Sequence, residues 1–409
     1  MTKYCCTNCN KEFTKKTDFT KHNKNNCSDN DNKQKLGQFF TTNYKYILQN
    51  FTIPDNITHI IEPFTGNGDL LNFINIDEKE KNKKYNIECY DIEPKKDFII
   101  NQDTINNPPN YSNKFIITNP PYLARNKSNE KELFDKYDVN DLYKCFIKNL
   151  LTNKCIGGII IIPLNFWSSI RKADIELRKL FLDIYEIIYL NIFEESVFED
   201  TTTTVCSFQF RLKTTTTVCS SDFSSNKDKN KEKEKEKEKE KEKNINNINN
   251  INNINISIYP SNNTISTILN NENNYMIGGH IYNLKSNNKY TITRLTSKNN
   301  DDKKDFITNI LVKCIDDNKD NQISMSFVND IYIDNTPNLT ARTYATLVIE
   351  PKLSIENQKK LINNFNDYLK ENREKYNSLF LTNYRESKDI ARKRISFDLV
   401  YNICDYLLE

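Results

Sequence analysis

The 409-residue sequence contains no long hydrophobic run and no strong excess of charge of either sign. No stretch of 18 consecutive apolar residues occurs, so the sequence predicts no transmembrane helix. Residues 1–3 lead into polar residues, unlike the start of a secretory signal peptide. The formal net charge is only +3, so any nucleic-acid contact has to depend on local charge. We therefore expect a soluble, intracellular protein of the cytoplasm or nucleus.

Cysteine usage supports the same compartment. The eleven cysteines are an odd number, and most stand alone within apolar segments, which favours reduced thiols over a disulfide framework. The richness in Asn, Lys and Ile fits an AT-rich genome, such as that of a giant DNA virus or a protist, more than any structural need. The exception to the isolated cysteines is a cluster near the N-terminus.

That cluster has the spacing of zinc ligands. Two cysteines are separated by two residues. A gap of 12 residues follows, and then a His and a Cys stand about one helical turn apart. The four candidate ligands are Cys6, Cys9, His22 and Cys27. The segment resembles a ββα zinc finger of the C2H2 family with Cys27 as a variant fourth ligand, and residues 17–25 would be its helix. Tyr4, Phe13 and Phe19 would form its small core. The alternative is a set of scattered thiols without metal.

The binding partner of such a finger stays open. Residues 1–37 hold eight Lys against four Asp or Glu, which suits contact with phosphates. A single finger reads only about three base pairs. The module could equally dock another protein or serve a structural role.

The most informative stretch is residues 115–122. Residues 115–118 are apolar and rich in β-branched types, which predicts a buried strand. The strand is followed by Asn119, Pro120, Pro121 and Tyr122, where two prolines impose a defined turn. The Asn119 side chain and the Pro120 carbonyl could hold a planar amino group, such as that of adenine, and Tyr122 offers a ring for stacking. An Asn-Pro-Pro turn could also be no more than a rigid loop.

Upstream polar residues follow other predicted strands. Residues 58–61 form a strand that runs into Glu62, Pro63, Gly66 and Gly68, and glycines at this place let a backbone approach a ligand. A second strand, residues 87–90, ends at Asp91 and Ile92, where a carboxylate usually takes ribose hydroxyls. A weak third strand, residues 97–100, leads to Asp103. These side chains should meet at one edge of a parallel sheet.

Together with residues 37–41, Gly-Gln-Phe-Phe-Thr, these motifs resemble the S-adenosylmethionine-dependent N6-adenine DNA methyltransferases of restriction-modification systems. The likeness covers about residues 36–210. It implies an α/β, Rossmann-like methyltransferase domain, direct methyl transfer to adenine and no catalytic metal. Thr42 stands where the family often has Pro.

The resemblance also implies roles for individual residues. Gln38, Thr41 and the loop from Glu62 to Gly68 would contact the methionine part of S-adenosylmethionine. Asp91 and Ile92 would hold its ribose and adenosine part, and Asp103 its adenine amino group. The target adenine, flipped out of duplex DNA, would be held by Asn119, Pro120, Pro121 and Tyr122. Phe198 is a candidate second stacking ring, and Trp167 is more plausibly part of the core than of the pocket.

We expect four regions. A zinc finger occupies residues 1–28 and the methyltransferase domain residues 36–212. Residues 213–274 include an alternating Lys-Glu run and an Ile-Asn-Asn repeat, which predict a disordered insert with a lesser chance of being an interaction tether. An α+β unit follows at residues 275–409, with strands at residues 290–295, 331–333 and 343–350 and helices at residues 355–379 and 395–408. Its basic stretch, residues 370–394, is a candidate target-recognition surface or an ordinary solvated face.

Two other functions stay open at this stage. One is a methyltransferase acting on RNA adenine or on a protein glutamine side chain, because Asn-Pro-Pro-Tyr also occurs in the release-factor glutamine methyltransferases. The other is a DNA-binding protein that has kept the fold without catalysis.

Overall fold

The computed structural model describes residues 4–5, 12–17, 20, 37–198, 203–213, 253–318, 320–387 and 390–408. At the N-terminus, β1 (Tyr4–Cys5) pairs antiparallel with β2 (Glu12–Phe13) and sets Tyr4 opposite Phe13. The candidate zinc ligands Cys6, Cys9, His22 and Cys27 lie outside the described residues. The zinc finger therefore stays a prediction.

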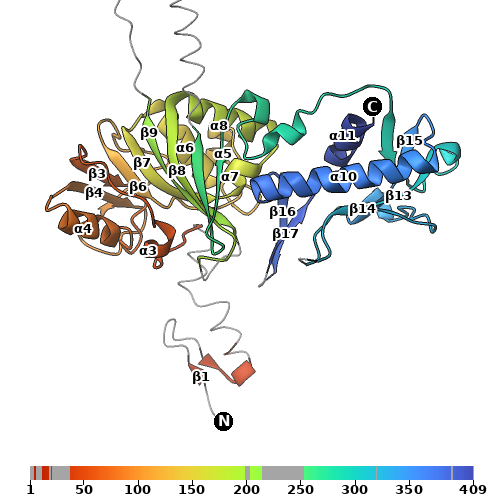
Figure 1. The fold of residues 1–409 in the computed structure, drawn as a ribbon. Coiled ribbons are helices and arrows are strands. Elements are labelled where there is room, and N and C mark those ends of the chain that lie inside the picture. The colour runs from red at the N-terminus through yellow and green to blue at the C-terminus, as the bar shows by residue number, and fades with distance from the viewer. Residues whose placement is uncertain are drawn as a thin grey trace, which may run out of the picture.

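The main unit is built on a nine-stranded sheet with the order β11-β10-β8-β9-β7-β6-β3-β4-β5 (Figure 1). Its first four strands along the chain are β3 (His59–Glu62), β4 (Asn86–Asp91), β5 (Ile100–Asn101) and β6 (Phe115–Thr118). The others are β7 (Gly157–Pro163), β8 (Tyr185–Phe193), β9 (Val205–Leu212), β10 (Ile254–Tyr259) and β11 (Asn263–Thr267). The chain runs from β3 outward to β5, then returns to place β6 on the other side of β3. This reversal makes the unit a doubly wound, Rossmann-like α/β fold.

Helices cover both faces of this sheet. The first group is α3 (Tyr44–Ile47) and α4 (Leu71–Glu80), and the second is α5 (Glu132–Tyr137), α6 (Leu142–Thr152), α7 (Asn165–Ser168) and α8 (Lys172–Ile184). Strand β9 shows that α3 and α8 lie on opposite faces, because its side chains alternate. Ser207 donates to the carbonyl of Ile47 in α3, whereas the rings of Phe208 and Phe210 pack against Phe181 of α8.

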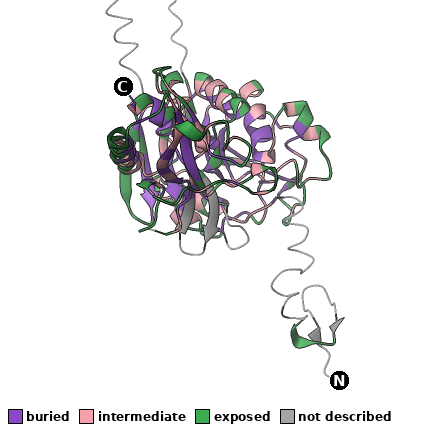
Figure 2. Cartoon of the chain, turned by 90° about the vertical axis from the view of Figure 1, so that its right-hand side faces the viewer, coloured by how far each residue is buried: buried purple, intermediate pink, exposed green. Residues whose placement is uncertain are grey.

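The apolar side chains of both faces form one core. The four residues of β6 and the seven of β7 are all buried, as is expected for strands covered by helices on both faces. Figure 2 shows the buried residues concentrated on the strands and the exposed ones on the outer helices. The strand predicted at residues 115–118 is confirmed.

The predicted boundary of the insert is wrong at its C-terminal end. Strand β10 pairs in parallel with β8, and β11 continues the sheet as its outermost strand, so residues 254–267 belong to the main unit. The physical reason is a change in the spacing of the isoleucines along the chain. The Ile-Asn-Asn repeat has a period of three, but Ile254, Ile256 and Ile258 recur every second residue, which is the period of a strand.

The C-terminal unit has its own antiparallel sheet, of order β12-β15-β13-β14. Its strands are β12 (Thr291–Arg294), β13 (Ile307–Lys313), β14 (Ser324–Phe327) and β15 (Tyr344–Glu350). The long helix α10 (Ile355–Tyr376) and the last helix, α11 (Phe397–Leu407), bury their apolar sides against it and form a second core. Residues 331–333, predicted as a strand, belong to no strand of this described unit; nearby, Asp334 forms an isolated bridge with Thr296.

Between α10 and α11 lies a hairpin of β16 (Thr382–Ser387) and β17 (Ile390–Arg394), within the stretch predicted as basic. The hairpin approaches α7, which follows the carboxyl end of β7. Two hydrogen bonds also join the units: Arg178 of α8 donates to the carbonyl of Asn274, and Asn377 donates to Glu194 after β8. The C-terminal unit therefore borders the edge of the sheet at which β7 and β8 end (Figure 1).

Candidate functional site

Three polar side chains predicted as site residues meet at the carboxyl edge of the main sheet. Glu62 is the last residue of β3, Asp91 is the last residue of β4, and Asn119 directly follows β6. Strand β3 lies between the other two, at the point where the chain reverses its direction across the sheet. A doubly wound sheet opens a crevice at this point, outside the carboxyl ends of its strands.

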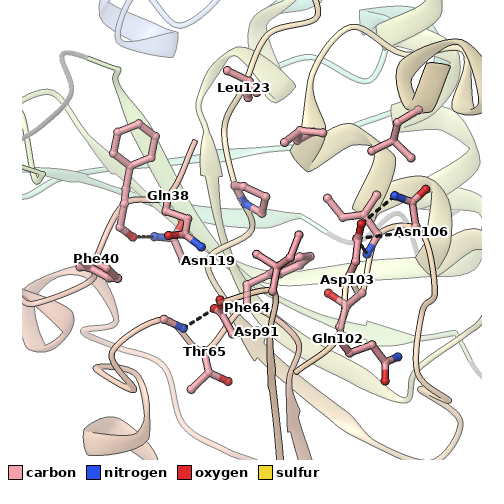
Figure 3. Close-up of a pocket in the computed structure, with 18 of the residues that line it drawn as sticks. Gln38, Phe40, Phe64, Thr65, Asp91, Gln102, Asp103, Asn106, Asn119 and Leu123 are labelled. Atoms are coloured by element: carbon pink, nitrogen blue, oxygen red, sulfur yellow. Dashed lines mark hydrogen bonds between the residues drawn. The ribbon is translucent and has the colours of Figure 1, made fainter. Parts of the chain in front are cut away.

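A cavity of about 320 Å³ occupies this crevice (Figure 3). Its volume lies within the range of small-molecule sites. Nine of the predicted residues line it: Gln38, Thr41, Glu62, Gly66, Asp91, Ile92, Asp103, Asn119 and Pro121. Four do not: Pro63, Gly68, Pro120 and Tyr122. The cavity is further lined by aromatic and aliphatic side chains absent from the prediction, such as Phe39, Phe40, Phe64, Leu123 and Leu133.

The glycine loop forms one wall of the cavity. Gly66 and Gly68 both have left-handed backbone angles, with φ of +53° and +79°, which side chains rarely adopt. The amide of Gly66 donates to the carboxylate of Asp91 at 2.7 Å, and a Cβ at Gly66 would lie 3.0 Å from the ring of Phe40. The loop is therefore held close to β4, and its backbone borders the cavity.

Glu62 presents a buried carboxyl group to the cavity. The residue is only 1 % exposed, and its Oε2 atom has no hydrogen-bond partner among the residues that the structure describes. Burial raises the pKa of Glu62 well above its ordinary value, and the negative charges of Asp69 and Asp91 raise it further. An unpaired acceptor in this position fits a cationic ligand group that would ionise the carboxyl and pair with it.

Asp91 is held by the backbone on both sides. Its Oδ2 accepts from the amide of Gly66, and its Oδ1 accepts from the amide of Glu93 at 2.8 Å. A carboxylate has about four acceptor positions, so capacity for ligand hydroxyls remains. Ile92, the next residue, is 45 % exposed at the cavity wall and offers an apolar surface.

Asp103 lies on the side of the cavity opposite Asn119 (Figure 3). Its Oδ1 accepts from the amides of Ile105 and Asn106, and its Oδ2 accepts from the side chain of Asn106 at 2.7 Å. These contacts fix the carboxylate at the start of a turn. The side-chain amide of Asn106 stands where a ligand amino group would otherwise donate.

Residues 37–41, which we call the strap, cross the site and orient Asn119. The side-chain nitrogen of Asn119 donates both of its hydrogens to the strap, one to the carbonyl of Phe39 at 2.8 Å and one to the hydroxyl of Thr41 at 3.1 Å. The amide group is thus fixed with its oxygen, Oδ1, directed away from the strap. The sequence showed both motifs but gave no sign of this connection between them.

Gly37 anchors the strap to the residue that closes the Asn-Pro-Pro-Tyr turn. Its carbonyl accepts from the amide of Tyr122 at 2.8 Å, and its φ is +68°. A Cβ at this position would lie 2.6 Å from the carbonyl oxygen of Tyr122, closer than such atoms approach. Only glycine fits here, which explains the first position of the motif.

Tyr122 lies beside the cavity and supports Asn119 from the other side. Its hydroxyl donates to Asn119 Oδ1, and the carbonyl oxygen of Ile161 in β7 is also within reach at 2.9 Å. Burial raises the pKa of Tyr122 well above its ordinary value, so the hydroxyl stays protonated and remains a donor.

The other predicted aromatic residues have different surroundings. Phe198, the candidate second stacking ring, contacts Phe39 with ring centroids 6.0 Å apart. Trp167 is buried between Phe166 and Phe208 and does not line the cavity, which agrees with a core role.

The described residues contain no group of three or more His, Cys, Asp or Glu that could hold a metal ion. None of the helices in the described ranges is both long and apolar enough to span a bilayer. The six cysteines of these ranges that follow the N-terminal segment, all buried, are unpaired: Cys89, Cys145, Cys155, Cys206, Cys314 and Cys404.

No protein-family model and no curated protein sequence matches this chain. Among solved structures, it is similar to the methyltransferase subunit of a type I restriction-modification system from Streptococcus thermophilus, with 13 % identity and a TM-score of 0.32 over 43 % of each chain. It is also similar to the M protein of the type I restriction enzyme EcoKI, with 12 % identity and a TM-score of 0.31 over 39 % of this chain and 40 % of that one. A third is the type IIG restriction endonuclease BpuSI, with 11 % identity and a TM-score of 0.34 over 65 % of this chain and 36 % of that one. Each alignment covers less than half of the neighbour's chain.

Proposed function

We propose that this chain is an S-adenosylmethionine-dependent methyltransferase that modifies the N6 amino group of an adenine flipped out of duplex DNA. The observation that carries the proposal is the fixed orientation of Asn119. Its nitrogen is engaged by the strap, so its Oδ1, which accepts from the Tyr122 hydroxyl, is the atom left to accept from an incoming group. An acceptor in that place suits a substrate amino group and not a carbonyl.

The cavity fits the proposed cofactor by the chemistry of its walls. The unpaired, buried carboxyl of Glu62 suits the methionine ammonium group, and the left-handed backbone at Gly66 leaves the loop without a side chain at the closest approach. Asp91 has acceptor positions left for ribose hydroxyls, with Ile92 beside it as an apolar wall. Asp103, on the far side, suits an adenine amino group if Asn106 yields its place. S-Adenosylmethionine, when bound, supplies an electrophilic methyl group.

The residues near Asn119 would prepare the nitrogen that receives the methyl group. The lone pair of an adenine amino nitrogen is delocalised into the ring, which makes the nitrogen a weak nucleophile. Two acceptors, Asn119 Oδ1 and the carbonyl of Pro120, would each accept a hydrogen bond from one N–H of the amino group. These two hydrogen bonds would favour a pyramidal nitrogen whose lone pair is available. Fixed acceptors of this kind act without reorganisation at the moment of reaction.

We propose duplex DNA as the partner because a second unit borders the site. In a duplex, the target base must leave the base stack before its amino group can react. Extrusion of a base costs a few kcal/mol, which stacking on Tyr122 would partly offset. The hairpin of β16 and β17, within a stretch of eight basic and four acidic residues, approaches the carboxyl edge of the sheet through α7. This placement supports contact between that stretch and the phosphates that flank the target.

The test is transfer of a labelled methyl group from S-adenosylmethionine to duplex DNA, RNA and protein, with the products identified by mass spectrometry. The proposal requires N6-methyladenine in DNA, and its loss in an Asn119→Ala variant that still binds the cofactor. Label only in RNA or in protein glutamine would retain the cofactor assignment and refute the substrate. No cofactor binding would refute both and leave the DNA-binding alternative.

We propose separately that Cys6, Cys9, His22 and Cys27 bind one structural zinc ion. The support is their spacing and the antiparallel pairing of β1 and β2, which corresponds to the ββ part of a finger. Metal analysis of the purified protein should find one zinc per chain, and a Cys6→Ser, Cys9→Ser variant should contain none.

A further inference from the structure

Phe39 lies in a stack of three aromatic rings beside Asn119. Its ring centroid is 5.3 Å from that of Tyr122 and 6.0 Å from that of Phe198, with interplanar angles of 30° and 29°. Phe39 is therefore the middle ring, and Tyr122 and Phe198 are the outer ones. The three side chains come from the strap, the turn after β6 and the segment after β8.

The middle position is the place that a planar ligand would take against Tyr122. A base held between two rings needs two successive van der Waals contacts, so the outer rings must stand about 7 Å apart. Between Tyr122 and Phe39 the centroids are only 5.3 Å apart, so no base can enter while Phe39 keeps this position.

We propose that Phe39 is a placeholder for the target base: it fills the stacking slot between Tyr122 and Phe198 and must leave it before a purine can stack on Tyr122. The inference rests on the proposed function for the identity of the base. Phe39 is then a residue that governs entry into the site, in addition to the residues that would hold the base once it is inside.

Burial indicates that the middle ring is the one that moves. Tyr122 and Phe198 are buried, whereas Phe39 is half-buried and lines the cavity. The backbone of Phe39 is held in place, because its carbonyl accepts from Asn119 and the neighbouring Gly37 pairs with Tyr122. Rotation of the Phe39 side chain about its own bonds would therefore open the slot without moving the acceptors that orient Asn119.

The placeholder also links the two halves of the site. Gln38 and Phe40, the immediate neighbours of Phe39, line the cofactor cavity together with Thr41 and Phe39 itself. A ligand in that cavity touches the same five-residue strap whose middle residue fills the base slot. Cofactor binding would thus restrict the motion of the strap around Phe39. A cofactor in the cavity would therefore influence entry of the base into the slot beside Tyr122.

The direct test uses a base without a DNA backbone. Binding of 9-ethyladenine is measured by calorimetry on the full chain with the cofactor cavity saturated by S-adenosylhomocysteine. Phe39→Ala should bind the base about tenfold more tightly than the wild type, because two aromatic contacts no longer compete with it. Phe39→Leu, which keeps apolar volume but no ring, should lie between the two. Circular dichroism and thermal unfolding establish that each variant is folded.

Phe198→Ala is the matched control, since it removes an outer ring and leaves the competitor in place. It should not tighten binding of 9-ethyladenine. Unchanged or weaker binding in Phe39→Ala would overturn the proposal, since weaker binding would make Phe39 a stacking partner of the base. An absence of binding in every variant would overturn it as well.

A second measurement separates this inference from the proposed function. If the wild type binds the base more weakly than Phe39→Ala but methylates no DNA, the placeholder role of Phe39 is retained. The proposed methyltransferase function is then refuted. Where DNA is methylated, 2-aminopurine at the mapped target position should become more fluorescent with Phe39→Ala than with the wild type, because flipping out is no longer opposed. Equal or lower fluorescence with Phe39→Ala would count against the placeholder.

Discussion

The hydroxyl of Tyr122 donates to the side-chain oxygen of Asn119, the atom proposed to accept from the substrate. A hydroxyl has one hydrogen to donate, and here a second acceptor, the carbonyl of Ile161, stands 2.9 Å away. The hydrogen can therefore turn from Asn119 to Ile161 when another donor arrives. The Tyr122 hydroxyl thus satisfies Asn119 Oδ1 and can release it without itself losing a hydrogen-bond acceptor.

Replacement of Asn119 should abolish most of the activity and little of the cofactor affinity. Removal of a fixed group that stabilises charge in the transition state typically lowers kcat by about 10²–10³-fold, and Asn119→Ala should fall in that range. Single-turnover methyl transfer and calorimetry with S-adenosylhomocysteine measure the two quantities. A variant that keeps wild-type kcat would remove Asn119 from the chemistry.

The ring and the hydroxyl of Tyr122 can be separated by two substitutions. Tyr122→Phe keeps the stacking surface, so the KM for DNA should stay within about threefold of wild type. Tyr122→Ala removes a base contact of about 1–3 kcal/mol and should raise that KM by about 5- to 150-fold. Steady-state kinetics on a duplex with the mapped site provides the comparison. Equal effects of the two substitutions would show that the hydroxyl, and not the ring, holds the base.

Glu62 should make cofactor affinity depend on pH. Burial raises its pKa in the folded protein, and an ammonium group beside it would favour the ionised form, so cofactor binding would release a proton. Affinity should therefore increase as the pH rises, measured below pH ~7 where the ligand amino group of pKa ~7.7–8.0 stays charged. Calorimetry in two buffers of different ionisation enthalpy counts the proton released.

Glu62→Gln is the matched variant for this measurement, since it keeps the shape and loses the charge. Its affinity for the cofactor should be lower by at least about tenfold, because a hydrogen bond to a charged group contributes about 1.5–3 kcal/mol. The affinity of this variant should also no longer depend on pH. Its stability should not fall at neutral pH: a raised carboxyl pKa means that ionisation disfavours the fold as pH rises, and Gln cannot ionise. Proton release that persists in Glu62→Gln would point to another group.

Gly37→Ala should disturb both stability and catalysis. The left-handed backbone and the 2.6 Å approach to the carbonyl of Tyr122 force the strap to shift, at a cost of about 1–3 kcal/mol in unfolding free energy. The shift displaces the groups that orient Asn119, so methyl transfer should fall together with stability. Urea unfolding and methyl-transfer assays report the two effects.

Gly278→Ala offers the control, because Gly278 has φ of +69° and a Cβ there would lie 2.9 Å from Tyr376, away from the site. It should cost comparable stability and leave kcat unchanged. If Gly37→Ala and Gly278→Ala reduce activity equally, the strap has no special role.

Residues 214–252 should be replaceable by a short linker. Leu212, at the end of β9, lies opposite Tyr185 at the start of β8, and Asn255, near the start of β10, lies opposite Tyr189 in its middle, so the two chain ends flank the first half of β8. Eight Gly or Ser residues, which span up to about 26 Å, are sufficient to join them across one strand. The melting temperature should change by less than about 2 °C, and methyl transfer should persist, because the site lies at the opposite edge of the sheet. Loss of cofactor binding would give these residues a part in the site.

Much of the fold follows from periodicity along the chain. The buried strand at residues 115–118 is found where the apolar pattern places it. The convergence of Glu62, Asp91 and Asn119 also follows, since carboxyl ends of parallel strands share an edge. The third strand, expected at residues 97–100, is shifted to Ile100–Asn101.

Other features depend on contacts between distant segments and leave little local signal. The pattern of residues 37–41 does not reveal that Thr41 and the Phe39 carbonyl orient an amide 78 and 80 positions away. Nor does it reveal that the ring of Phe39 lies between two others. Burial alternates along β13, but a polar residue, Thr308, takes one of the buried positions and the apolar Leu311 lies on the less buried side, so the apolar residues themselves do not alternate.

The late return of the chain to the main sheet has a consequence for any attempt to shorten the protein. Strand β8 is an interior strand only because β10 pairs along it, and β11 then covers β10. A fragment that stops after β9 would contain the whole cavity but would leave the nine-residue strand Tyr185–Phe193 with a free, largely apolar edge. Such an edge recruits strands from other copies. A catalytic fragment that extends through Thr267 should therefore remain monomeric where one ending at Leu212 aggregates.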